Sequence, residues 1–489
     1  MKKLNYEKWK SPAIVAVSLV VVMYVLWLQL SSLNPFVSSW DQVDFSLAIE
    51  RYDLRAMRPH FPGYPYFILG GLLAKFIVEE PNQALVLFNI LIYASSIIPV
   101  YIIASRLISR ESAFMAAAVI YTASYPLIIV NQPMSEGAAL AVFWWYFLSI
   151  VTAWERKSGK WLLLPLFLFS VLLGIRLSYI PLGAGMIYLF CKKWKDHQIG
   201  SVGLLTYTFA AGVFQLIWIG GLIMTEGGIA NFLELAFGFT GGHFQEWGGT
   251  TTSNDLSIIA RIKIFLFTNI FWWGIFSRTH VLMVLYIVIG LFIFWPGTKS
   301  NLFKNMPFTL GVLMMSAYGI WALFAQNIDK ARHILPVAVI LIFLVLSAFF
   351  KRYPNIYSSL LILILLIAQA MVSANLVKTQ ANEEPAVYQL ARFLEETNEE
   401  FVLYTWEETR VLGYLKMPYS HKRINTYKVF LHDQSLYKDK TVYLTDKVVD
   451  GFRAQGIEID KRVEKIRIFN SEKIFDPVYN EIILYKWTP

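Results

Sequence analysis

Long apolar segments separated by short polar loops fill the chain up to about residue 376, and they constrain its fold more than any other feature. The first segment, residues 13–31, follows a basic start with four lysines among its first ten residues. A helix needs about 20 apolar residues to cross a bilayer, so this segment is long enough to span one and to stay as an anchor. Because basic residues favour the cytoplasmic side, we expect a cytoplasmic N-terminus and an extracytoplasmic loop after residue 31.

The later apolar segments predict a polytopic membrane protein. Residues 64–77 are short for a crossing and predict an interfacial or re-entrant helix, whereas 161–192 lies between basic clusters and predicts two crossings. Residues 257–276 are ambiguous, and we favour an outer-leaflet position because it keeps Lys304 and Lys351 inside. Together with the other expected spans, these segments predict about eleven crossings, an odd number that puts the C-terminus outside. The other expected spans are 83–105, 112–130, 137–154, 201–224, 280–296, 306–326, 334–350 and 355–374.

The composition changes at about residue 377, so we expect a transmembrane domain over 1–376 and an extracytoplasmic α/β domain over 377–489. An amphipathic pattern predicts a helix over 383–397. Short β-branched and aromatic runs predict strands at 401–404, 441–444 and 482–485.

Charge and cysteine content exclude several classes of protein. The net charge is +9, but the basic residues of the apolar part stand mainly in short loops, where they set topology, so we expect no nucleic acid partner. Cys191 is the single cysteine of the chain, which rules out an intramolecular disulfide and any multi-cysteine metal site.

The first outer loop carries charged residues that are costly near a bilayer unless they have a function or a partner. Residues 41–52 have helical spacing, with Phe45, Ala48, Ile49 and Tyr52 on one face. A proline-rich stretch over 59–65 ends this helix. The candidate site residues of this loop are Asp41, Asp44, Arg58, His60 and Tyr64.

Other predicted outer loops contribute further candidates, and their convergence would build one site. A carboxylate can take the proton of an acceptor hydroxyl, and arginines can hold a leaving phosphate. A glycine-rich segment over 241–252 predicts a loop that closes over a substrate. These further candidates are Glu136, Arg176, His243, Glu246, Arg332 and His333.

Four motifs resemble those of GT-C-fold glycosyltransferases, closest to the protein mannosyltransferase and aminoarabinose transferase relatives of families 39 and 83. Residues 41–45 (DQVDF) resemble the Asp-Glu-x-x-aromatic pattern that follows the first span, with Gln42 in place of the usual glutamate. The run 59–65 resembles the proline-rich turn of that loop, and Glu136 matches the second acidic position. Residues 332–336 (RHILP) resemble the Arg-aromatic-x-x-Pro segment. The resemblance covers about residues 10–375.

The resemblance implies inverting transfer of a sugar from a polyprenyl-phosphate donor to a lipid, glycan or protein acceptor at the outer face. Asp41 would be the general base, and Asp44 or Glu136 would orient the acceptor. Arg58, Arg176 and Arg332 would bind the phosphate. It also implies no metal ion, and Gln42 weakens the case for a paired-carboxylate metal site, although a divalent cation stays open.

Alternative interpretations of the same residues are structural or belong to another class of protein. Asp41 and Asp44 could cap a helix at the membrane surface, and Arg58 and His60 could anchor at lipid headgroups. A transporter or flippase for a lipid-linked saccharide would also need polar groups, but it usually shows repeated halves and a site at the bilayer midplane. A third possibility is a structural or assembly subunit whose function resides in its C-terminal domain.

Overall fold

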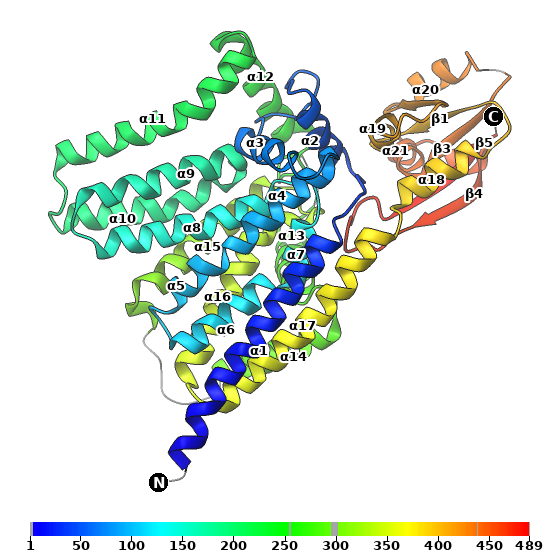
Figure 1. The fold of residues 1–489 in the computed structure, drawn as a ribbon. Coiled ribbons are helices and arrows are strands. Elements are labelled where there is room, and N and C mark those ends of the chain that lie inside the picture. The colour runs from blue at the N-terminus through cyan, green and yellow to red at the C-terminus, as the bar shows by residue number, and fades with distance from the viewer. Residues whose placement is uncertain (1–2, 254–255, 295–301, 438, 489) are drawn as a thin grey trace.

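The computed structural model describes residues 3–253, 256–294, 302–437 and 439–488. It shows a bundle of long helices with a small sheet at one end, and the N-terminus lies at the opposite end (Figure 1). This arrangement confirms the predicted fold class, a helical membrane domain followed by a small C-terminal α/β domain.

In the described ranges, eight helices are long and apolar enough to cross a membrane, or nine if the bent pair α6 and α7 forms one span. The protein is therefore a multi-pass membrane protein, while the count of about eleven crossings stays a prediction. The end of the expected 280–296 span lies outside the described residues. The helices of the bundle are α1 (Lys3–Ser31), α4 (Pro81–Ser95), α5 (Ile97–Ala104), α6 (Arg110–Tyr121), α7 (Ser124–Val130), α8 (Glu136–Glu155), α9 (Leu163–Ile175), α10 (Ala184–Lys195), α11 (Ser201–Thr225), α14 (His280–Phe294), α15 (Met306–Ala325), α16 (Leu335–Arg352) and α17 (Ile356–Asn382).

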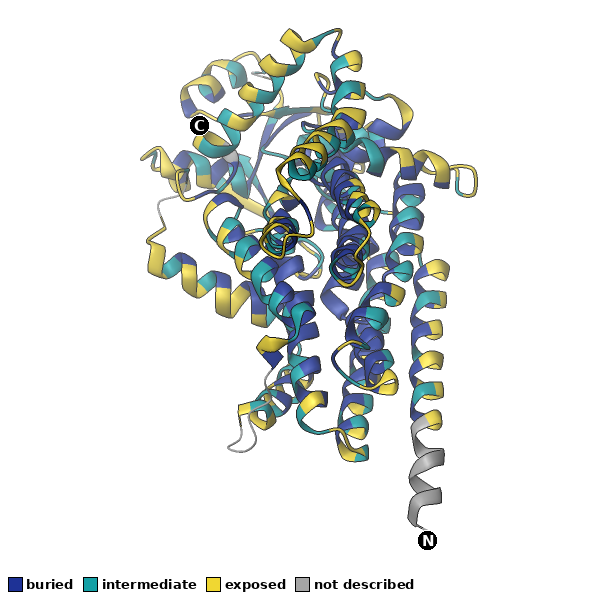
Figure 2. Ribbon diagram, turned by 90° about the vertical axis from the view of Figure 1, so that its left-hand side faces the viewer, coloured by how far each residue is buried: buried dark blue, intermediate teal, exposed yellow. Residues whose placement is uncertain are grey.

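Exposed residues lie along the outer faces of the bundle (Figure 2), and many of them are large and apolar. On α11, Val202, Leu205 and Phe209 are 78%, 70% and 75% exposed. Water disfavours an apolar surface of this extent, whereas lipid tails accept it. These exposed faces support a position of the helices within a bilayer.

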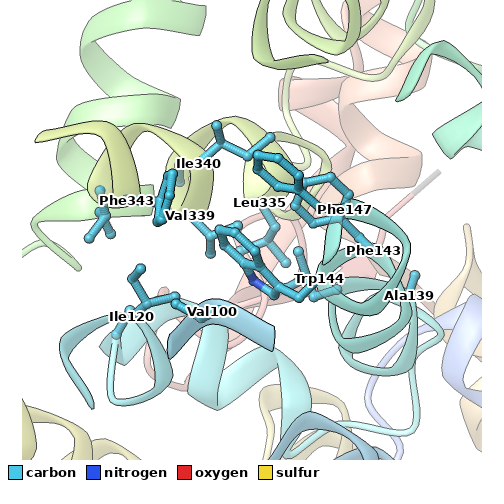
Figure 3. Packing of buried hydrophobic residues seen from close by; sticks show 14 of the residues in the cluster. Val100, Ile120, Ala139, Phe143, Trp144, Phe147, Leu335, Val339, Ile340 and Phe343 are labelled. Carbon is cyan, nitrogen blue, oxygen red and sulfur yellow. The ribbon is translucent and has the colours of Figure 1, made fainter. Parts of the chain in front are cut away.

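Aromatic packing joins α8 to α16 in the centre of the bundle (Figure 3). The ring of Trp144 lies 5.6 Å from that of Phe343 and is stacked on Phe147 at 6.0 Å between centroids. Val100 and Ile120 approach the same cluster from α5 and α6. Because α8 and α16 are packed along this seam, the first turn of α8 lies beside the segment that leads into α16.

The break between α6 and α7 bends the chain by 56° and frees backbone carbonyls inside the bundle. Two side chains of α17 satisfy them: Gln369 Nε2 donates to the carbonyl of Val119 at 2.7 Å, and Ser373 Oγ donates to that of Thr122 at 3.0 Å. A helix break within a membrane protein needs such partners, since lipid offers none.

The first loop contains two short helices, α2 (Trp40–Glu50) and α3 (Pro65–Ala74). As predicted, Phe45, Ala48 and Ile49 of α2 are buried on one face. Pro65 begins α3, where the missing N–H costs nothing, and the helix of 10 residues is too short to cross a bilayer.

The glycine-rich segment 241–252, expected to be a loop, is helical over its first part. α12 (Ile229–Gly242) continues through the glycines into a π-helical turn (η3, His243–Trp247), so the expected lid is helical over this part. Phe239 of α12 packs on Phe61 at 5.6 Å, and such contacts outweigh the glycine cost of about 1 kcal/mol per residue. α13 (Ile258–Lys263) and the π-helix η4 (Ile264–Ile275) form one helical unit that meets the length of a span.

The C-terminal domain has a five-stranded sheet in the order β2-β1-β3-β5-β4. β1, β3 and β5 confirm the three predicted strands, whereas β2 and β4 lack a clear apolar pattern and were not predicted. β1 is parallel to β2 and β3, and β5 is antiparallel to β3 and β4. The elements are α18 (Ala386–Glu395), β1 (Phe401–Thr405), α19 (Glu408–Tyr414), β2 (Ser420–Arg423), α20 (Tyr427–Gln434), β3 (Thr441–Thr445), α21 (Asp446–Ala454), β4 (Val463–Asn470) and β5 (Glu481–Trp487).

The C-terminal domain shares a core with the first loop. Val37 and Val43 are fully buried among residues of α18 and the sheet, such as Leu390. The backbone N–H of Val37 donates to the hydroxyl of Tyr388 at 3.1 Å. The helix α17 continues past the predicted domain boundary at 377 to Asn382, so it leads directly into this domain.

Candidate active site

Asp41 stands in the first turn of α2, and its carboxylate is paired with two cations. The guanidinium of Arg332 contacts it directly, and Nζ of Lys330 lies 3.9 Å away. Burial disfavours the charged carboxylate, but the positive charges of Lys330 and Arg332 outweigh this cost and hold the pKa of Asp41 below its ordinary value. The side chain is 26% exposed, so a substrate can reach it.

Glu136 is the first residue of α8 and is fully buried. Its Oε1 atom lies 3.0 Å from Arg176 Nη2 and 3.0 Å from Arg332 Nε. The N-terminus of a helix also favours a carboxylate. Arg332 therefore bridges Asp41 and Glu136, two acids that are far apart in the sequence.

Arg176 occupies the turn between α9 and the 3-10 helix η2 (Leu177–Gly183), as expected for the tip of the 161–192 hairpin. It donates to Ser135 Oγ at 2.9 Å and lies 3.2 Å from Nδ1 of His333. The carbonyl of His333 accepts a hydrogen bond from Tyr318 at 2.9 Å, which fixes the segment before α16.

We call Asp41, Glu136, Arg176, Lys330 and Arg332 the ion cluster. Its three cations face two carboxylates, one of them partly exposed, and the carboxyl group of Asp476 also interacts with Lys330 and Arg332. Guanidinium groups bind phosphate in a bidentate manner, and an ionised carboxylate can accept a proton. The arrangement suits the transfer of a group away from a phosphate.

Asp44 belongs to a second group, which we call the Asp44 group. Asp44 Oδ2 lies 3.1 Å from His60 Nδ1, and His60 Nε2 lies 2.9 Å from the hydroxyl of Tyr64. Arg410 of α19 donates to Asp44 Oδ1 from Nε at 3.0 Å and from Nη2 at 2.7 Å. Burial raises the pKa of Asp44 above its ordinary value, and His60 and Arg410 offset only part of this rise.

Gln42, the departure from the GT-C pattern, has its own structural role. Its Oε1 accepts from the N–H of Ser38 at 2.8 Å, and its Nε2 donates to Gln132 at 3.3 Å. Gln132 in turn donates to the carbonyl of Phe475 in the C-terminal domain at 3.0 Å. A glutamate could not donate to Gln132, so the amide suits this link between the two domains.

Three predicted residues lie apart from both the ion cluster and the Asp44 group. Arg58 pairs through its backbone with Asp53, and across the described ranges no ion pair of its guanidinium is found. Nε2 of His243 lies 3.0 Å from the carbonyl of Ala325, and Glu246 is exposed. The roles of these three residues stay predictions.

Lys330 and Arg410 were not predicted as site residues. Lys330 stands two residues before Arg332, so the charge of that segment was a usable signal. Arg410 lies in the C-terminal domain, 366 residues after its partner Asp44, and no local pattern points to it. Among the described residues, no three His, Cys, Asp or Glu side chains gather as a metal site would need, and metal independence stays a prediction.

No protein-family model matches the chain, and no curated protein matches its sequence. Among solved structures, the chain is similar to ArnT from Cupriavidus metallidurans bound to undecaprenyl phosphate, with a TM-score of 0.53, 12% identity and 97% of each chain covered. The apo form of ArnT gives the same TM-score and coverage at 11% identity. The Archaeoglobus fulgidus oligosaccharyltransferase in complex with Zn and sulfate gives a TM-score of 0.51 at 11% identity, covering 88% of this chain and 67% of that one.

At such low identity these similarities show the fold alone. The chain has the GT-C fold, as its motifs predicted.

Proposed function

We propose that this protein is a membrane glycosyltransferase that moves a hexose or pentose from a polyprenyl-phosphate carrier to an acceptor at the outer face of the membrane. The ion cluster is the observation that carries the proposal, because it combines a partly exposed, ionised acid with guanidinium groups from separate segments. The similarity to ArnT, solved with undecaprenyl phosphate bound, supports the class of donor.

In the proposed reaction, the acceptor oxygen attacks the anomeric carbon from the side opposite to the phosphate. The bond between that carbon and the phosphate oxygen breaks, and its electron pair leaves with the polyprenyl phosphate. Asp41 takes the proton of the acceptor hydroxyl, while Arg332, Arg176 and Lys330 hold the phosphate. Displacement in one step inverts the anomeric centre.

The pairing of Asp41 with Arg332 and Lys330 suggests how the donor prepares the base. These cations lower the pKa of Asp41 and make it a weak base in the free protein. A donor phosphate binds the same cations and weakens their hold on Asp41. The pKa of Asp41 then rises, and the base gains strength when the donor is in place.

Glu136 has a positioning role in this proposal. It is fully buried between Arg176 and Arg332, so it orients these guanidinium groups for the phosphate. Asp44 is also fully buried and is held by His60 and Arg410. It fixes α2 and therefore the position of Asp41.

The proposal is tested by transfer from a panel of polyprenyl-phosphate sugars with the purified protein in liposomes. Asp41→Asn should lower kcat by about 10³-fold, since a positioned base contributes about 10²–10⁴-fold. Glu50→Gln is the matched control, because Glu50 is an exposed acid at the far end of α2, and it should keep the wild-type rate. Transfer by Asp41→Asn at the wild-type rate would refute the role of Asp41.

A further inference from the structure

The carboxyl ends of β1 and β2 carry an aromatic and basic surface that the proposed reaction does not use. The two strands are parallel and end side by side, with Thr405 opposite Arg423, and Trp406 follows β1 directly. Open α/β sheets bind their ligands at the carboxyl ends of such strands. The position of this surface in the sheet therefore points to a binding site.

The same surface reaches the first loop. α19, which follows β1, packs against α2, and Trp40 is the first residue of α2. The guanidinium carbons of Arg410 and Arg423 lie 5.4 Å and 5.3 Å from the centre of the Trp40 ring. That of Arg423 also lies 4.4 Å from the centre of the Trp406 ring. We call these four residues the Trp40–Arg423 site.

The charges of the Trp40–Arg423 site do not balance. Asp44 neutralises Arg410, but Arg423 is exposed, and within the described part of the chain no carboxylate lies within ion-pair distance of it. The nearby acids are engaged elsewhere: Asp433 pairs with Lys422, Glu407 lies against Tyr479, and Glu408 is buried. The site therefore presents one uncompensated guanidinium between two tryptophan rings.

We propose that the Trp40–Arg423 site binds the acceptor, and that the acceptor is a sugar with an acidic group, a phosphate or a carboxylate. Tryptophan faces stack on apolar sugar faces, and an arginine binds either acid in a bidentate manner. Trp40 directly precedes Asp41 in α2, so the site and the proposed base stand on the same short helix. This inference rests on the proposed glycosyl transfer and specifies its acceptor.

The test measures binding by the full-length protein in nanodiscs, with glucose, glucose 6-phosphate and glucuronate as probes in saturation-transfer NMR titrations. We expect at least one acidic sugar to bind about fivefold or more tightly than glucose. A hydrogen bond to a charged group contributes enough binding free energy for a preference of this size. Arg423→Gln should remove the preference. The acid that is preferred distinguishes a phosphate from a carboxylate.

Two further variants make the outcome decisive. Arg467→Gln is the matched control, because Arg467 also stacks on aromatic rings, those of Phe393 and Phe469, but lies on the distant edge strand β4. This variant should bind all three sugars as the wild type does. Trp406→Leu should weaken all three sugars. Equal binding of the acidic sugars by wild type and Arg423→Gln, or no preference over glucose, would overturn the inference. Because no turnover is measured, this failure is distinct from a failure of the proposed transferase activity.

Discussion

Arg332 connects the two acids of the ion cluster. The residues next to it in the sequence do not indicate which acids it contacts. It contacts Asp41, which is 291 residues away, and lies 3.0 Å from Glu136. An arginine suits this position because its planar, permanently charged group presents donors in several directions, whereas a lysine offers one point charge. The central chemistry therefore depends on the packing of α16 against α8, which brings these residues together.

Lys330 provides a test through pH. Its positive charge helps to lower the pKa of Asp41, so Lys330→Met should raise that pKa toward its ordinary value. A base must be ionised, so the acid limb of kcat/KM should move to higher pH. Because Lys330 also holds the phosphate in the proposed reaction, kcat/KM should fall at every pH, and the shift of the acid limb isolates the effect of Lys330 on Asp41.

The matched control for Lys330→Met is Lys378→Met, an exposed lysine on α17 that lies outside the ion cluster. Its pH profile should follow that of the wild type. An unchanged acid limb in Lys330→Met would contradict the electrostatic role of Lys330.

At the level of single residues, the motif at 41–45 and the charged positions Glu136, Arg176 and Arg332 were predictable from the sequence. The separation of Asp44 from Asp41 was not. The two acids are three residues apart on one helix, but Asp41 faces Arg332 and Asp44 faces His60 and Arg410. Sequence spacing gives the helix face, whereas the partners on each face come from distant segments.

α2 is the element on which the two domains meet. Its first turn carries Asp41 toward the bundle, while Val43 packs into the core of the C-terminal domain and Asp44 pairs with Arg410 of α19. The helix is short, with 11 residues, so its position depends on these contacts and not on its own stability.

The Asp44–Arg410 pair should therefore contribute to stability. Asp44 is fully buried, so Arg410→Met leaves a buried carboxylate without its main cation, which costs about 3 kcal/mol. We expect a lower thermal unfolding midpoint in detergent, and partial recovery when Asp44→Asn is added, because the neutral amide needs no cation. Arg392→Met is the control: Arg392 belongs to an exposed pair with Glu384, and its loss should cost less than about 1 kcal/mol. A midpoint equal to that of the control would contradict a structural role of the Asp44–Arg410 pair.

The elements themselves were predictable to different degrees. The long helices follow from the length of the apolar segments, and the three central strands follow from short β-branched and aromatic runs. The exposed strands β2 and β4 do not, since tertiary pairing and not an apolar pattern holds them. The helical course of 241–247 was also not predictable, because glycines normally indicate a loop and the packing of Phe239 on distant aromatic residues decides otherwise.

For the whole molecule, α2 and the C-terminal sheet lie toward the end of the bundle opposite the N-terminus (Figure 1), and Asp41 of the ion cluster stands in the first turn of α2. We predict a cytoplasmic N-terminus, which would place both on the extracytoplasmic side. A background in which Cys191 is replaced by Ser allows a test with single cysteines. Ser435→Cys, exposed directly after α20, should react with a membrane-impermeant maleimide in intact cells, whereas Ser158→Cys, exposed in the loop after α8, should react only after lysis.

The two sites are matched, since both replace an exposed serine by cysteine. The opposite labelling pattern would place the C-terminal domain on the cytoplasmic side. Equal labelling of both sites in intact cells would refute the predicted topology.

The most direct test of the central claim, that the ion cluster acts as one catalytic unit, is a double-mutant cycle on kcat/KM for sugar transfer with Asp41→Asn and Arg332→Gln. Each single variant should lose about 10³-fold, and the double variant should lose little more than the worse of the two, since residues that act as a unit are not additive. Losses that multiply in the double variant would show that Asp41 and Arg332 act independently and would contradict the proposed site.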